Sequence, residues 1–91
     1  MKSKRITNKE LVEFVKKLPS VATGGNGGDC HHVTSRGAGG DDVATNLMPL
    51  SRKEHVEWHQ LGPKKFCEKY PTAFEWLKRA GRLDVIERMK R

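Results

Sequence analysis

The segment CHHVTSRGAGGDDVATNLMPLSRKEHVEWHQLG, residues 30–62, contains all four histidines of this 91-residue chain. His31 and His32 are adjacent, whereas His55 and His59 are four residues apart. Histidine is a common metal ligand, and its imidazole titrates near neutral pH. Four histidines in about a third of the chain therefore predict a metal site. We expect the rest of the fold to form around this segment.

Short elements of two kinds are expected within this segment. Residues 30–33 and 46–50 predict two short strands, which are joined by a glycine-broken loop over residues 34–45. A Ser and a Glu three positions apart then form a capping box, so a helix is expected over residues 51–61 with Gly62 just past its end. The predicted order is strand, loop, strand, helix.

This order places the two pairs of histidines on different kinds of element, one on a strand and one on a helix. On a helix, His55 and His59 project from one face about one turn apart and can reach a single ion together. On a strand, successive side chains point to opposite faces, so His31 and His32 cannot both face that ion. One of the two can bind the metal while the other points at an attacking water. If His55 and His59 were the only histidines of the chain, a packing role would be as good an explanation as metal binding. They are accompanied by His31 and His32.

Helices are expected on both sides of the segment. They are predicted over residues 7–18, 63–70, 72–80 and 83–91, the second from Pro63 at a first helical position and the others with apolar residues on one face. The third of these begins with another capping box, Thr72 and Glu75. Residues 20–29 are rich in glycine and predict a loop. The sequence therefore predicts one domain, residues 1–91, of the α+β class and mostly helical, with core motif 30–62, N-terminal helix 7–18 and C-terminal helices across 63–91.

Composition restricts the classes of partner and of site. Lys and Arg number 18 against 11 acidic residues, a net charge of +7, which favours polyanions and nucleic acid first. No apolar run is long enough to cross a membrane, and no signal-peptide core follows the basic start, so we expect a soluble cytoplasmic protein without a membrane partner. Cys30 and Cys67 form no C-x-x-C pair, which excludes a disulfide framework and a four-cysteine zinc site.

Phosphodiester hydrolysis fits histidines combined with a metal. The reaction needs a nucleophilic water, stabilisation of charge on the phosphate and help for the leaving 3′ oxygen. A neutral imidazole can take a proton from water, and a divalent metal neutralises the developing charge. The sequence therefore predicts a metal-dependent nuclease.

The motif resembles that of the HNH endonucleases, the ββα-metal or His-Me finger fold. The resemblance rests on these residues, laid on strand, strand and helix: His31-His32-Val33, Asn46 and His55-x-x-x-His59. The run HHV…GAGGDD…NLMPLSRKEHVEWHQLG is similar, more narrowly, to small phage-type HNH nucleases, which implies a bacterial or phage-infected cell. Where that pattern often has Cys and His, this chain has Ser51 and Glu54, so the family's auxiliary zinc-binding half-site is not expected.

The resemblance implies a role for each signature residue. His32 is expected to be the general base that activates water, while His31, His55 and His59 are expected to be metal ligands. Asn46 is expected to orient His32 by hydrogen-bonding its backbone across the strand pair. Because some family members bind the metal through an Asn, direct ligation by Asn46 is an alternative.

Other polar residues of the loop are weaker candidates. Arg36 could hold the substrate phosphate by a bidentate contact, although an exposed loop arginine is an equal alternative. Asp41 and Asp42 are explained by loop and turn chemistry, with metal ligation a minor alternative. Cys30 is expected to be a small buried residue rather than a ligand or nucleophile.

The expected cofactor is one divalent metal ion, Mg or Mn first, with Ni, Co or Zn as alternatives. The expected partner is DNA, nicked with weak sequence specificity, and a homodimer is one route to double-strand cleavage. The competing hypothesis is a non-catalytic, zinc-stabilised nucleic-acid-binding module, in which His31, His55 and His59 hold zinc with Cys30 as a further ligand. A metalloprotease is disfavoured, because the helix lacks H-E-x-x-H.

Overall fold

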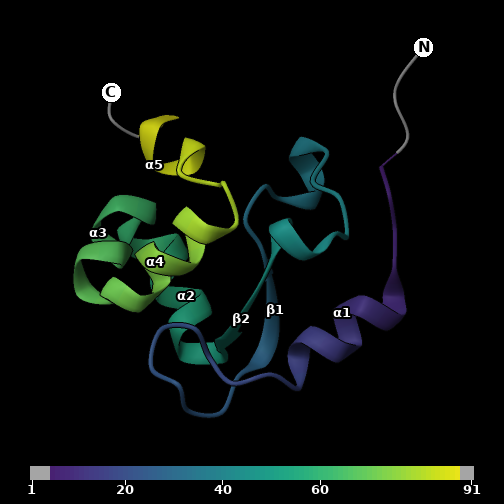
Figure 1. Cartoon of the computed structure of the whole chain (residues 1–91), viewed down its shortest axis with the longest axis horizontal. Coiled ribbons are helices and arrows are strands. Elements are labelled where there is room, and N and C mark those ends of the chain that lie inside the picture. Colours follow the sequence, from purple (N-terminus) through teal and green to yellow (C-terminus); the bar gives the residue numbers. More distant parts are fainter. Residues whose placement is uncertain (1–4, 89–91) are drawn as a thin grey trace.

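The centre of the molecule is a two-stranded antiparallel sheet (Figure 1). The computed structural model describes residues 5–88, and its strands are β1 (Gly28–His32) and β2 (Leu47–Ser51). His32 pairs with Leu47 at one end of the sheet. Two short 3₁₀ helices, η1 (Arg36–Ala38) and η2 (Ala44–Asn46), lie in the loop between the strands.

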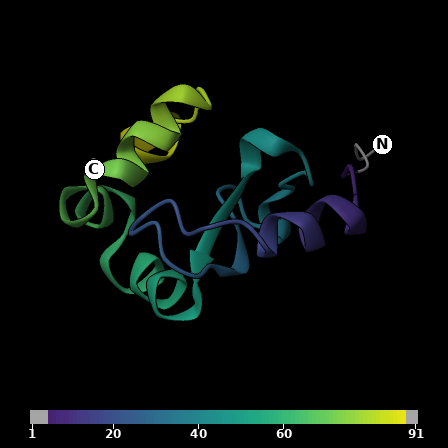
Figure 2. The same cartoon turned by 60° about the horizontal axis from the view of Figure 1, so that its bottom comes forward.

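Helices cover both faces of this sheet. They are α1 (Lys9–Lys16), α2 (Arg52–Leu61), α3 (Pro63–Lys69), α4 (Pro71–Arg79) and α5 (Asp84–Arg88). Figure 2 shows α1 on one side of the strands and α2, α3 and α4 on the other. The predicted α+β class, mostly helical, is therefore confirmed for residues 5–88. None of the described helices is long and apolar enough to cross a membrane.

Local capping signals set the start of α1 and both ends of α2. Asn8 caps α1, because its side-chain oxygen accepts a hydrogen bond from the backbone N–H of Leu11 at 3.0 Å. Ser51 and Glu54 form the predicted capping box at the start of α2. Gly62 ends α2 with a φ of 85°, a conformation that L side chains rarely adopt. The predicted position of this central helix is confirmed.

Other boundaries differ from the prediction. The helix α4 begins at Pro71, and no side chain caps it, so the capping box predicted at Thr72 is wrong. The Thr72 hydroxyl instead donates a hydrogen bond to the backbone oxygen of Ala22 at 2.9 Å. Asn46 lies in η2, one residue before β2 begins. The part of the last predicted helix that covers residues 89–91 lies outside the described residues.

The sheet separates two apolar clusters. Met48 and Leu50 on β2 are fully buried against the side of Trp58 and Phe66. Leu47, which points the other way, packs with two valines of α1 in a smaller cluster. Because side chains alternate along a strand, each face of this short sheet is committed to a different set of helices. The same alternation divides the side chains of β1.

Candidate functional site

Three of the four histidines converge on one face of the sheet. His31 comes from β1, and His55 and His59 come from successive turns of α2. One ring nitrogen from each lies within 4.8 Å of the others. The centroid of the His31 ring is 4.9 Å from that of His55 and 5.5 Å from that of His59. The three residues predicted to be metal ligands are thus brought together.

His31 is the most deeply buried member of this cluster. Its side chain is 2% exposed, its ring centroid lies 4.6 Å from that of Trp58, and its Nε2 has no hydrogen-bond partner. Burial, followed by the nearby rings of His55 and His59, lowers the pKa of His31 to about 3. The ring is therefore neutral at pH 7. A buried nitrogen without a hydrogen-bond partner is unusual in proteins.

A carboxylate orients a second member of the cluster. Asp29 lies two residues before His31 on β1, and its Oδ2 is 3.0 Å from Nδ1 of His55. When Nδ1 donates to Asp29, Nε2 of His55 carries the free electron pair. Histidines that bind metals usually donate their other N–H to such a carboxylate. Sequence reasoning missed Asp29, although its position two residues before His31 in a strand places both on one face.

His32 has a different partner. Its Nε2 lies 2.8 Å from Oδ1 of Asp42, which is 5% exposed and also accepts hydrogen bonds from Arg5 and the backbone N–H of Asn8. The hydrogen bond from Asn8, then that from His32, lowers the pKa of Asp42. An ionised Asp42 keeps the proton on Nε2, so Nδ1 of His32 is left as an acceptor. From the sequence, Asp42 was explained by loop and turn chemistry, and its contact with His32 was not predicted.

The histidines share a cavity of about 330 Å³. His31, His32 and His59 all line it. Its remaining walls are formed by apolar residues, such as Trp58, and by the hydroxyl-bearing loop that follows His32. The cavity therefore borders His32 and two members of the three-histidine cluster, His31 and His59.

Asn46 positions the loop, but not through the backbone of His32 as predicted. Its Oδ1 accepts from the backbone N–H of Thr34 at 2.7 Å, and its Nδ2 donates to the backbone oxygens of Thr34 and Asp41 at 3.1 and 2.9 Å. Arg82, which the sequence did not single out, donates to the same Oδ1 at 2.9 Å. With both side-chain atoms occupied, Asn46 is a loop-positioning residue rather than a metal ligand.

Two other predicted candidates lie elsewhere. Arg36 is exposed and lines a separate cavity with Lys9 and Lys16, so the structure does not place it in the cavity of the histidines. Its predicted contact with a phosphate beside the metal is not supported by this position. Cys30 packs toward α1, and burial raises its pKa to about 11. It is absent from the three-histidine cluster, which removes it as a further zinc ligand.

Comparison with known proteins places the chain in a family. Residues 1–84 match the family described as "Protein of unknown function (DUF968)". No curated protein and no solved structure shows a significant match to the chain. The matched residues include the three-histidine cluster, His32, Asp42 and Asn46. The chain therefore belongs to the DUF968 family.

Proposed function

We propose that this protein is a metal-dependent endonuclease of the HNH type that hydrolyses phosphodiester bonds in DNA. The observation that carries the proposal is the buried, unpartnered Nε2 of His31 beside the rings of His55 and His59. The order β1, β2, α2, with histidines on the first strand and on the helix, supports the resemblance to the ββα-metal fold. A net charge of +7 supports a polyanionic substrate.

His31, His55 and His59 would hold one divalent ion. Such an ion would supply Lewis-acid chemistry, the neutralisation of charge on a phosphate held beside these histidines. Imidazole nitrogens suit Zn, Ni and Co better than Mg, which prefers oxygen ligands. Three imidazole nitrogens as ligands therefore favour a transition metal over Mg.

His32 would act as the general base. With Nε2 donating to Asp42, Nδ1 is the nitrogen that would take the proton from a water molecule, and His32 is among the residues that line the cavity. The water oxygen forms a bond to phosphorus as the bond to the 3′ oxygen breaks. That oxygen takes a proton from solvent water, and His32 returns to solvent the proton it accepted. The products are a 5′ phosphate and a 3′ hydroxyl, as the family resemblance implies. One such site nicks one strand.

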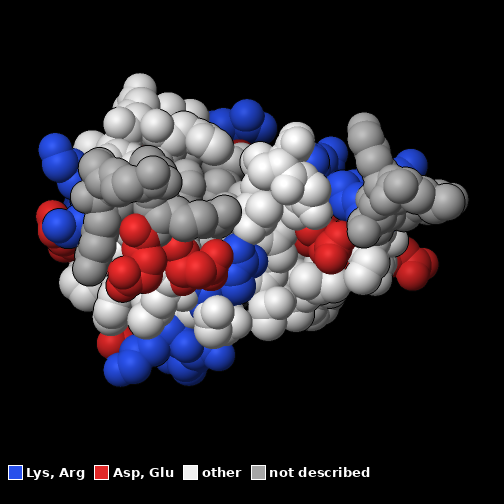
Figure 3. Space-filling model, turned by 90° about the horizontal axis from the view of Figure 1, so that it is seen from above, with Lys and Arg blue, Asp and Glu red and all other residues white. Residues whose placement is uncertain are grey.

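Weak sequence specificity is expected from the distribution of positive charge. Figure 3 shows Lys and Arg side chains in several separate groups on the face it presents, with acidic groups between them. No Lys or Arg of the described residues lines the cavity of the histidines. Phosphate contacts from scattered cations hold DNA without reading its sequence.

A plasmid nicking assay tests the proposal. Wild type, His32→Ala and His31→Ala are each incubated with Mn, Ni, Co, Zn, Mg or EDTA, and metal binding is titrated in parallel. We expect metal-dependent nicking that His32→Ala abolishes without loss of metal binding, whereas His31→Ala loses both. Tight zinc binding with no cleavage of any DNA, and unchanged DNA affinity in His32→Ala, would instead establish the non-catalytic zinc-stabilised module.

A further inference from the structure

An apolar groove of about 400 Å³ lies away from the histidines. Leu11 and Leu18 line it from the side of α1, Pro49 lines it from β2, and Trp76 lines it from α4. Phe14 also lines it and is 57% exposed, the largest value among the exposed large apolar side chains of residues 5–88. In a chain that is 32% charged, an apolar surface of this kind is typical of an interface.

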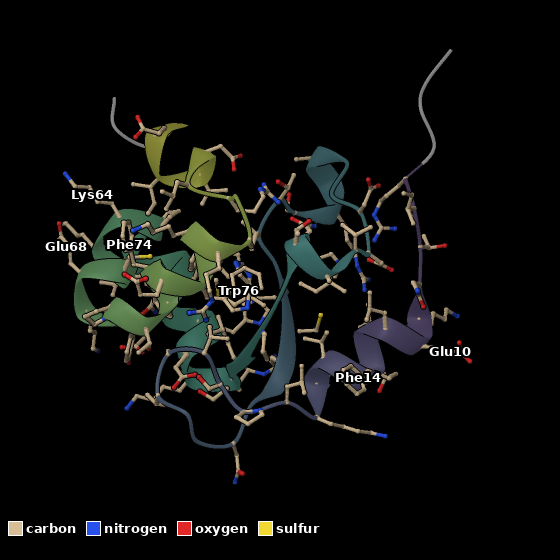
Figure 4. The ribbon with its side chains drawn as sticks, viewed as in Figure 1. Glu10, Phe14, Lys64, Glu68, Phe74 and Trp76 are labelled. Carbon is tan, nitrogen blue, oxygen red and sulfur yellow. The ribbon has the colours of Figure 1, made fainter. Side chains whose placement is uncertain are left out.

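Charges of opposite sign flank Phe14 on the same helix face. Glu10 lies four residues before Phe14 and Lys17 lies three residues after it, so the three project in a similar direction. Both charged residues are exposed, and neither forms an ion pair within residues 5–88. Figure 4 shows Glu10 and Phe14 along α1, with Trp76 across the strands from them.

We infer that this groove is the interface of a homodimer in which α1 packs antiparallel against α1 of a second copy. A two-fold contact is formed by the same patch on both copies, so the patch must be complementary to itself, as a patch with both a projection and a recess is. Phe14 and the groove supply these two features.

The charges fix the direction of this packing. With a two-fold axis near Phe14, Glu10 lies about 6 Å before the axis and Lys17 about 4.5 Å after it, at 1.5 Å per residue. Each Glu10 therefore meets the partner's Lys17, and the contact gains two equivalent ion pairs. Parallel packing would instead bring like charges together.

A second copy fits this groove better than DNA does. The groove is apolar, and the charges beside it are of both signs, since Glu10 is followed by Lys17 and Glu13 is paired with Lys16, so a phosphate backbone gains no net attraction there. Because α1 is 8 residues long, the contact is small, which predicts a weak and reversible dimer. This inference goes beyond the proposed nuclease activity and stands whether or not the protein cleaves DNA.

Sedimentation equilibrium over a range of concentrations tests the dimer. We expect wild type to be in a monomer–dimer equilibrium, and Phe14→Asp to be monomeric. Glu10→Lys or Lys17→Glu alone should each raise the dimer Kd by about tenfold, because each replaces two attractions with two repulsions. The double variant Glu10→Lys/Lys17→Glu should restore the wild-type Kd, since the pairs are reformed with exchanged signs.

Two control variants test whether the change in Kd is specific to the groove rather than a general effect of a new charge on the surface. Phe74 on α4 is 36% exposed and lies outside the groove, so Phe74→Asp should leave the Kd unchanged. Glu68→Lys on α3 changes the net charge as Glu10→Lys does and should also have no effect. Figure 4 shows both control residues on the opposite side of the molecule from α1.

Three results would overturn the dimer. A monomeric wild type at every concentration is the first, and a dimer that Phe14→Asp leaves intact is the second. The third is failure of the charge exchange to restore association while the double variant keeps the circular dichroism and melting temperature of wild type. A nicking assay is blind to all three, so failure of this inference and failure of the proposed function are distinguishable.

Discussion

Nε2 of His32 lies 2.8 Å from Oδ1 of Asp42, which is buried at the base of the loop between the two strands. Asp42 is also held by Arg5 and by the backbone N–H of Asn8, so the carboxylate has a fixed direction. It therefore determines which nitrogen of His32 carries the proton. A fixed tautomer is what a histidine base requires in order to accept a proton from water.

Replacing this carboxylate is expected to reduce turnover rather than binding. Asp42→Asn removes the charge that keeps the proton on Nε2, and we expect kcat for nicking to fall by about 10²-fold or more. KM and metal affinity should stay near wild type, because Asp42 contacts no member of the three-histidine cluster. The neighbouring Asp41→Asn is the control. Equal loss in both variants would contradict a specific role for Asp42.

The lowered pKa of Asp42 also predicts that the free energy of unfolding depends on pH. Its pKa in the folded protein is below the ordinary value of 3.8, so near and below that pH the unfolded chain binds more protons. The stabilisation is complete above this range and is lost as the pH falls through the folded pKa. Urea unfolding of wild type and Asp42→Asn should therefore show a stability difference that shrinks below about pH 4. A difference that does not shrink at all as the pH falls below 3.8 would refute this.

The carboxylate beside His55 is expected to control metal affinity. Asp29→Asn replaces the acceptor at 3.0 Å from Nδ1 of His55, and the metal Kd should rise by about 10- to 100-fold. Titration calorimetry with Zn or Ni measures this directly, without any cleavage assay. Glu68→Gln on the exposed side of α3 is the matched control. An unchanged Kd in Asp29→Asn would show that the Asp29 carboxylate does not control metal binding through His55.

Glu54 is expected to be a structural residue, despite its place beside His55. Burial alone would raise its pKa, but hydrogen bonds from Ser20, the backbone of Ser51 and Thr23 outweigh burial and lower it. Glu54→Ala leaves these donors without an acceptor and removes the capping box. We expect the free energy of unfolding to fall by about 2–3 kcal/mol in urea denaturation. Lys53→Ala, on the exposed side of the same turn, should change it by less than about 0.5 kcal/mol.

Two glycines of the loop are expected to differ in how far substitution by alanine destabilises the protein. A Cβ at Gly40 would lie 1.8 Å from the backbone oxygen of Thr34 and 2.9 Å from Nδ2 of Asn46, whereas a Cβ at Gly37 meets nothing within 4 Å. Gly40→Ala should therefore displace the loop that Asn46 holds and lower the melting temperature by several degrees, about 2 kcal/mol or more. Gly37→Ala should behave as wild type. Similar melting of the two variants would contradict the close approach at Gly40.

The sequence was informative where the signal is local. The capping box of Ser51 and Glu54 and the glycine after the helix located α2, because they satisfy the backbone groups that the helix leaves unpaired at its own ends. The spacing of His55 and His59 then placed both on one face. Thr72 is the exception: Pro71 already occupies the first helical position, and the hydroxyl finds Ala22 instead of capping.

Contacts between distant residues were not readable in the same way. Nothing in the pattern around His32 shows that Asp42 rather than Asp41 meets it, or that Arg82 reaches Asn46 from beyond α4. These pairings depend on how the loop folds back over the sheet. The predicted position of Arg36 near the phosphate failed for the same reason, the folding of the loop. Arg36 lies in the 3₁₀ helix η1, and this turn directs its side chain to a different cavity.

The order of strand, strand and helix, and the histidines on each, could be predicted from the sequence, since periodicity and caps act within a few residues of chain. Three features became visible only in the folded chain: His31 is buried with an unpartnered nitrogen, Asp29 and Asp42 contact two different histidines, and Phe14 is exposed beside an apolar groove. The physical reason is that burial and hydrogen-bond partners are properties of packed surfaces, which form only when segments far apart in sequence meet.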